Sequence, residues 1–147
     1  MKIIKGSDMP YEAASHEDPK SPGVLKRVLA RKDDLIPGRV QMINWAQMPA
    51  GQTFKCHYHE EMEEVFVIVS GKAEIEIENE RSTLDAGDMV IIPPRAKHVM
   101  TNTGSEPVNY IVLGIVSRAG GKTGKRSRGY FYKQLNFGSF FLKRDLP

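Results

Sequence analysis

The sequence predicts an all-β domain, and three observations lead to this prediction. Short runs of β-branched, aromatic and other apolar residues recur from Val24 onward, Gly, Pro, Asn and Asp separate them, and no segment shows sustained helical periodicity. This pattern is typical of a sandwich or a barrel. With 147 residues, 40% of them hydrophobic and 27% charged, the chain has the size and composition of one soluble globular domain.

The chain divides into three segments. Residues 1–23 hold turn formers and both signs of charge, which indicates an N-terminal arm with one strand expected at residues 2–5. Residues 24–116 carry the β pattern and are predicted to form the barrel. Residues 117–147 combine a basic, glycine-rich loop at 118–128, which has five Lys or Arg, with six of the chain's eleven Phe and Tyr residues. Such aromatics need burial on the barrel or on a second copy, so we expect a homodimer.

The clearest hairpin of the barrel segment spans residues 64–78. Val65–Val69 is a nearly continuous apolar run, a turn follows around Gly71, and the next six residues alternate so that Ile75 and Ile77 face a core. Further strands are expected at residues 24–31, 39–48, 53–59, 81–84, 89–92, 98–102 and 108–116.

The single cysteine and the distribution of charge indicate the cellular compartment and the type of partner to expect. The single cysteine, Cys56, cannot form an internal disulfide, so we expect the reducing cytoplasm. Charged residues stand where a signal peptide would need an apolar run, and the longest apolar runs are too short to span a bilayer. The net charge of +3 is mild and slightly favours an anionic small molecule as partner.

Three of the four histidines fall in two short segments. His57 and His59 are one residue apart on an expected strand, so their side chains share a face, and Cys56 must point the other way. Glu64 begins the next strand, and His98 opens another strand after a rigid Pro-Pro turn. Three imidazoles and one carboxylate are suitable ligands for a borderline divalent ion.

The spacing of these residues resembles both motifs of the cupin superfamily. The residues that match the first motif are Gly51, then after five residues His57-Tyr58-His59, after four more Glu64, and after six more Gly71. Those that match the second are Gly87, then after five residues Pro93, followed by His98 and, after three more, Asn102. The fifteen residues between Gly71 and Gly87 are similar to the spacing in compact prokaryotic members.

The resemblance implies a jelly-roll barrel, also called a double-stranded β-helix, in a single domain. It implies that His57, His59, Glu64 and His98 bind one divalent transition metal, which ligand identity leaves open among Mn, Fe, Ni and Zn. One departure is Arg95, which occupies the position where the second motif usually has glycine. Arg95 places a positive charge near the mouth of the barrel, so we include it among the candidate residues of the substrate pocket.

Residues near the expected metal ligands in the sequence are further candidates for the substrate pocket or for catalysis. Lys55 and Thr53 share the alternation of His57, so on a regular strand both point into the cavity. For Lys55, recognition of a substrate anion and a position at the cavity rim both stay open. Glu63 is an alternative ligand to Glu64 and a candidate proton carrier, although the gap to the next motif glycine favours Glu64.

Residues that share the alternation of His98 also enter the candidate pocket. Met100 is expected in the cavity wall, and Asn102 is expected to form hydrogen bonds at the end of a strand. His16, beside two acidic residues in the arm, is interpreted as an ordinary polar residue.

Two function classes follow. The first is a metal-dependent enzyme on a small oxygen-rich substrate, with oxygenase-type chemistry ranked first and sugar or sugar-phosphate isomerisation or decarboxylation second. The alternative is a non-enzymatic, metal-dependent module that binds a sugar or carboxylate. A phosphate loop at residues 121–123 is excluded because Val116 stands where its first glycine belongs. The modest net charge also disfavours nucleic acid as a partner of the basic loop.

Overall fold

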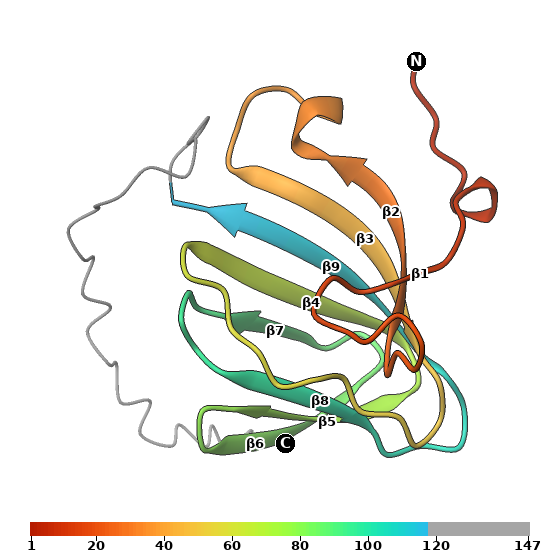
Figure 1. Ribbon diagram of the computed structural model, residues 1–147, viewed down its shortest axis with the longest axis vertical. Coiled ribbons are helices and arrows are strands. Elements are labelled where there is room, and N and C mark those ends of the chain that lie inside the picture. Colours follow the sequence, from red (N-terminus) through yellow and green to blue (C-terminus); the bar gives the residue numbers. More distant parts are fainter. Residues whose placement is uncertain (118–147) are drawn as a thin grey trace, which may run out of the picture.

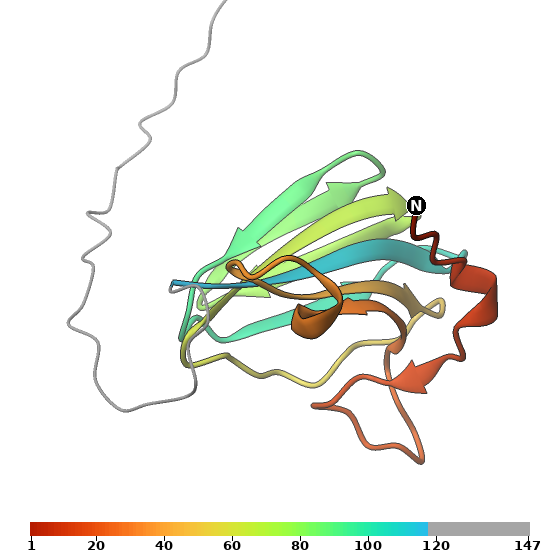
Figure 2. The same cartoon turned by 90° about the horizontal axis from the view of Figure 1, so that it is seen from above.

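The computed structural model describes residues 1–117, which form two antiparallel β-sheets (Figures 1 and 2). The strands are β1 (Glu12–Ala13), β2 (Leu25–Arg31), β3 (Val40–Met48), β4 (Met62–Ser70), β5 (Lys72–Ile77), β6 (Glu80–Asp85), β7 (Met89–Ile92), β8 (His98–Asn102) and β9 (Val108–Val116). The larger sheet has the order β1-β2-β3-β9-β4-β7 and the smaller the order β6-β5-β8. Two short 3-10 helices, Gly6–Asp8 and Lys32–Asp34, complete the described chain.

The core fills the space between the two sheets. Successive side chains of a strand point to opposite faces, so Phe66 and Ile68 of β4 and Tyr110 of β9 meet on the inner face of the larger sheet. Ala73 and Ile75 of β5 supply the inner face of the smaller one. This arrangement is the predicted all-β barrel of the double-stranded β-helix type. No helix in residues 1–117 is long and apolar enough to cross a membrane.

Most of the strand predictions are confirmed, and β7, β8 and β9 begin and end at the predicted residues. The strand expected at residues 2–5 was wrong, because the arm pairs with the edge of β2 only at Glu12–Ala13. Residues 53–59 are not a regular strand either, since isolated bridges at Thr53 and His57, rather than a continuous ladder, pair them with β8. The basic loop and aromatic tail, residues 118–147, lie outside the described residues, so their packing stays a prediction.

The N-terminal arm lies against the barrel through a few specific contacts. A guanidinium nitrogen of Arg27 in β2 donates to the Gly6 carbonyl at 2.8 Å, and the same group lies 4.1 Å from the centre of the Tyr11 ring. The carboxylate of Glu17 accepts the backbone N–H groups of Gly23 and Lys55, both at 2.7 Å. The arm is therefore fixed beside β2 and beside the segment that carries His57 (Figure 1).

Candidate metal centre

Four side chains from three parts of the chain meet inside the barrel. His57 and His59 lie on the segment between β3 and β4, Glu64 lies in β4, and His98 is the first residue of β8. Reciprocal backbone hydrogen bonds of 3.2 and 3.0 Å join His57 to His98 and so set two imidazoles side by side. One possible ligand atom of each residue lies within 4.8 Å of those of the other three.

Backbone carbonyls orient two of the imidazoles. The Nδ1 atom of His57 lies 2.8 Å from the Lys55 carbonyl, and Nδ1 of His98 lies 3.0 Å from the Ala96 carbonyl. A carbonyl can only accept, so in each neutral ring Nδ1 carries the proton and Nε2 presents its lone pair to the cluster. This is the tautomer that a metal ligand requires.

The atoms that face one another in the cluster share no hydrogen bond. The Nε2 atoms of the three histidines and Oε2 of Glu64 are buried and have no hydrogen-bond partner among the described residues. Oε2 of Glu64 nevertheless lies 3.2 Å from Nε2 of both His59 and His98. The lone pair on Nε2 of His98 faces this carboxylate oxygen, and at this distance the two repel unless a proton or a metal cation lies between them. Three imidazole nitrogens and one carboxylate oxygen therefore fit a divalent transition metal.

The protonation states of Glu64 and the histidines are also those that a divalent metal ion requires. Burial raises the pKa of the Glu64 carboxyl, but in metal-free protein hydrogen bonds and positive charge from His59 and His98 outweigh this effect and lower its pKa to about 2, so the group is a carboxylate. Burial lowers the pKa of His57, and its hydrogen bond to the Lys55 carbonyl offsets this only in part. With neutral imidazoles, a divalent ion here leaves a net charge of about +1, which favours an anionic oxygen ligand.

A hollow of about 260 Å³ lies beside the cluster. Its wall includes His59 and Glu64, so a molecule in the hollow reaches the centre directly. Most of the remaining wall is apolar and comes from both the arm and the barrel: Ala14, Val24, Met42, Ala46, Phe54, Met62, Phe66, Tyr110 and Val112. The other polar side chains along it are Ser15, His16, Lys26 and Asn44. This volume fits a small organic molecule.

His16 is not among the four residues of the cluster, which agrees with its interpretation as a residue other than a ligand, but its place beside the site was not predicted. Its ring stacks on His57, with centroids 3.6 Å apart and an interplanar angle of 16°, and it lines the hollow. Burial and the neighbouring His57 lower the pKa of His16 to about 4, which keeps the ring neutral. No spacing rule links residue 16 to the later motifs, so only the fold could reveal this contact.

The two candidates before His57 do not lie in the hollow. Thr53 and Lys55 are exposed, and Phe54 between them faces the core with 2% of its surface exposed. The expected alternation with His57 was wrong because isolated bridges, rather than a continuous ladder, hold this segment. Cys56 is exposed, which agrees with its exclusion from the ligands.

The remaining candidates also lie away from the hollow. Glu63 occupies the face of β4 opposite to Glu64, Met100 is fully buried in the core, and neither lines the hollow. The side-chain amide of Asn102 donates to the carbonyls of Met48 and Glu106, which is the strand-end role expected of it.

Arg95 is exposed and pairs with Glu60 at 3.1 Å. Its φ of 70° lies in the left-handed region, which favours glycine, so the backbone here keeps the turn that the family motif builds with glycine. The guanidinium points to an exposed carboxylate rather than into the hollow.

Comparisons with known proteins agree with this architecture. The family model described as "Cupin domain" matches residues 44–114. An uncharacterized protein of Methanocaldococcus jannaschii is 27% identical over 111 residues, which cover 76% of this chain and 85% of that protein. Among solved structures, one described as a predicted oxalate decarboxylase from Thermotoga maritima gives a TM-score of 0.69 at 20% identity, covering 78% of this chain and 99% of that one. The polyketide cyclase RemF from Streptomyces resistomycificus gives 0.65 at 15% identity, covering 78% and 79%.

Proposed function

Since the chain belongs to the cupin superfamily, we propose that it is a metal-dependent enzyme that binds a small oxygen-rich substrate at the centre formed by His57, His59, Glu64 and His98. The observation that carries this proposal is the set of four buried, unpartnered ligand atoms that face one another at one end of a hollow. A bound Mn, Fe, Ni or Zn ion would supply Lewis-acid or, for iron and nickel, redox chemistry there.

Oxygenase-type chemistry is the first form of this proposal. The hollow is mostly apolar, and Glu64 is the one carboxylate along it, so the described residues offer no second carboxylate as a base. Such a pocket holds and orients the substrate and excludes water, and leaves the reactivity to the ion. This division of roles suits oxidation better than a reaction that needs several proton transfers by the protein.

Isomerisation of a sugar or sugar phosphate, or decarboxylation, is the second form. The observation that favours it is His16, which lines the hollow and whose buried Nε2 atom forms no hydrogen bond among the described residues, although it lies 3.3 Å from Oε1 of Glu17. A neutral imidazole beside a bound substrate can accept or return a proton. The likeness to a structure described as a predicted oxalate decarboxylase is compatible with this form.

Elemental analysis of protein purified without an affinity tag tests the centre itself. We expect about one equivalent of a transition metal per chain, which His57→Ala abolishes and His98→Ala strongly weakens. Glu63→Gln is the matched control, since Glu63 lies on the opposite face of β4 and should leave the metal content unchanged. A wild-type protein that binds no metal under any loading condition contradicts the proposal.

Turnover assays separate the enzyme from a binding module. Diketones, hydroxy acids, phenols and sugar phosphates are incubated with the metal-loaded protein, with and without dioxygen, and consumption of each is measured. Loss that requires dioxygen supports an oxygenase, and loss without it supports isomerisation or decarboxylation. Ligands that raise the melting temperature yet are never consumed support instead a non-enzymatic sugar- or carboxylate-binding module.

A homodimer in the cytoplasm is a separate part of the proposal. It rests on the six aromatic residues within 130–141 and on the single cysteine, and light scattering tests the assembly. If the protein is a monomer in solution, the dimer proposal is wrong, and the proposal of a metal centre is unaffected.

A further inference from the structure

We propose that Lys26 and Asn44 form a second anchor in the hollow, which binds a carboxylate of the substrate while its other end lies at the metal centre. This inference rests on the proposed function and narrows its substrate class. The ligand would be a short molecule that carries chelating oxygens at one end and a carboxylate at the other.

The sheet register points both side chains into the barrel. Lys26 pairs with Ala46, and Asn44 pairs with Val112. Residues paired across antiparallel strands share a face, and Ala46 and Val112 are both buried in the core. Lys26 and Asn44 therefore extend from the inner face, and both line the hollow beside the metal centre.

Asn44 is buried without adequate hydrogen bonds. It is 4% exposed, its Oδ1 atom has no hydrogen-bond partner among the described residues, and its Nδ2 atom reaches only the sulfur of Met42 at 3.3 Å. A thioether is a weak acceptor, and buried amides normally form stronger bonds. A ligand oxygen that accepts from Nδ2 of Asn44 would replace its weak bond to sulfur, whereas Oδ1 would need a donor such as an N–H or O–H group of the ligand.

Lys26 supplies the charge. Its side chain is only 17% exposed, and its one carboxylate neighbour in the described chain is Glu12, with Oε1 3.7 Å from the ammonium nitrogen. The Glu12 side chain is 50% exposed, so this pair is weak and a ligand can replace it. One ammonium group matches the single charge of a carboxylate.

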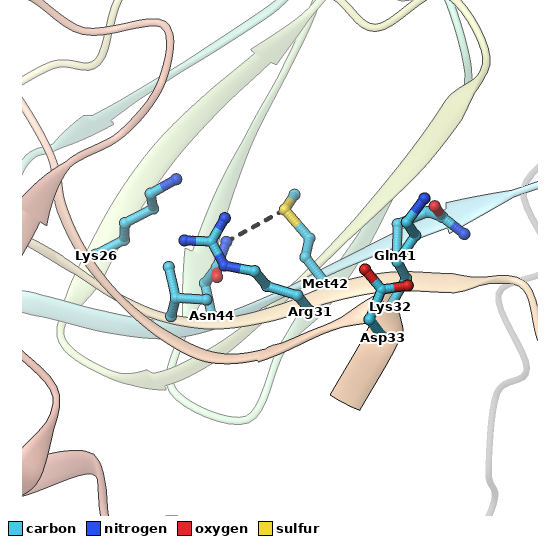
Figure 3. Close-up of a pocket in the computed structure, with 8 residues that line it drawn as sticks. Lys26, Arg31, Lys32, Asp33, Gln41, Met42 and Asn44 are labelled. Carbon is cyan, nitrogen blue, oxygen red and sulfur yellow. Dashed lines mark hydrogen bonds between the residues drawn. The ribbon is translucent and has the colours of Figure 1, made fainter. Parts of the chain in front are cut away.

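A positively charged opening leads to this anchor. A second hollow of about 340 Å³ shares Lys26, Met42 and Asn44 with the first one, and Figure 3 shows these three together with Arg31, Lys32 and Asp33. Three cationic side chains against one carboxylate give the opening an excess of positive charge. Such an opening attracts anionic ligands toward Lys26.

The length of the ligand follows from the strand spacing. β9 alone separates β3, which carries Asn44, from β4, which carries Glu64. Glu64 and Met42 both pair with Gly114, so Glu64 is also offset from Asn44 by two residues along the strands. The two strand spacings and this offset correspond to roughly 12 Å between these backbones, and the side chains shorten the gap. A substrate with a chain of five or six carbons therefore reaches both ends of the hollow.

A matched pair of acids tests the anchor. 2-Oxopentanedioate and 2-oxopentanoate share the chelating end and differ only in the distal carboxylate, and calorimetry on the Mn²⁺-loaded protein gives the affinity of each. We expect the diacid to bind at least about tenfold more tightly, as one charge-assisted hydrogen bond would provide. Lys26→Met should reduce the ratio to about one and leave the monoacid affinity unchanged, and Asn44→Asp should also abolish the preference. Lys72→Met, an exposed lysine on the other sheet, is the control that keeps it.

The outcomes distinguish this inference from the function on which it rests. Equal affinities in the wild type, or a preference that survives Lys26→Met, overturn the anchor even where both acids bind in a metal-dependent way. A Lys26-dependent preference for the diacid that persists in metal-free protein supports the anchor and contradicts the role of the metal centre. Lys26→Met alone decides the test if the buried Asn44→Asp variant does not fold, because the Lys26 side chain is outside the core cluster.

Discussion

The hollow is bounded by two walls that are built in different ways. On the barrel side, Glu64, which lines the hollow, and His98, which belongs to the same cluster, lie in strands, where continuous hydrogen-bond ladders fix the backbone. On the arm side, His16 lies on the loop between β1 and β2, where the Glu17 carboxylate and one short strand pair replace a ladder. The difference teaches that strand ladders fix Glu64 and His98, whereas the cover beside them is held by a few separate contacts, of which the Glu17 carboxylate makes two.

The largest effect expected from this comparison is on the barrel side. Glu64→Gln removes the one negative charge of the cluster and leaves a buried amide against His59 and His98. Since loss of groups that merely orient a ligand costs 10- to 100-fold in metal affinity, we expect about a hundredfold loss or more. A competition titration with a chromogenic chelator measures it. Glu63→Gln is the control, and an equal loss in both variants would contradict the assignment of Glu64.

Gly23→Ala tests the arm side, because it should disrupt the packing of the N-terminal arm on the barrel. A Cβ atom on Gly23 would overlap the carbonyl oxygen of Thr53, and this backbone has little room to move away. We expect a loss of about 1–3 kcal/mol in the free energy of unfolding, together with detachment of the arm. Urea unfolding and proteolysis within residues 14–23 measure the two effects.

Gly38→Ala is the matched control for this substitution. A Cβ there would meet nothing closer than the Ile36 carbonyl at 3.6 Å, which is an ordinary contact. Metal affinity should fall less in Gly23→Ala than in Glu64→Gln, because all four ligands remain and two backbone hydrogen bonds still join His57 to His98. A hundredfold loss of metal affinity would show that the arm positions the ligands after all.

The contrast between residues in regular strands and residues held by isolated contacts also explains which parts of the site could be predicted from the sequence. Glu64 and His98 could be assigned to one site because the spacing of the residues around them resembles the two motifs of the cupin superfamily. Lys55 and Thr53 were misplaced because their segment, held by single bridges, does not keep this alternation. His16, Lys26 and Asn44 were missed as pocket residues, since their approach to the site comes from the packing of the arm and from sheet register rather than from any local pattern.

Glu17→Gln tests whether one carboxylate holds the arm. A carboxylate accepts the N–H groups of Gly23 and Lys55 through its two oxygens, but an amide has a single oxygen, so one donor would face the NH₂ group. We expect a loss of about 1–2 kcal/mol in the free energy of unfolding. Asp18→Asn is the control, because this exposed carboxylate accepts only the nearby Lys20 N–H. Equal losses in the two variants would mean that Glu17 is not the anchor.

The smallest expected effect concerns the charge of the arm residue that covers the site, and it is measured on metal-free protein. The pKa of His16 is lowered from 6.5 to about 4 in the folded chain, so between these pH values the unfolded chain binds more protons. The stability from the neutral ring is therefore complete above pH 6.5 and is lost as the pH falls toward 4, and because water reaches this partly buried ring, we expect the total loss to be smaller than that of Glu17→Gln. His57 and Glu64 contribute in the same direction, so the wild type still loses stability for other reasons. Urea unfolding at several pH values should give a shallower dependence for His16→Asn than for the wild type. Identical slopes would mean that His16 titrates as it does in the unfolded chain, and hence that the arm does not close over the site in solution.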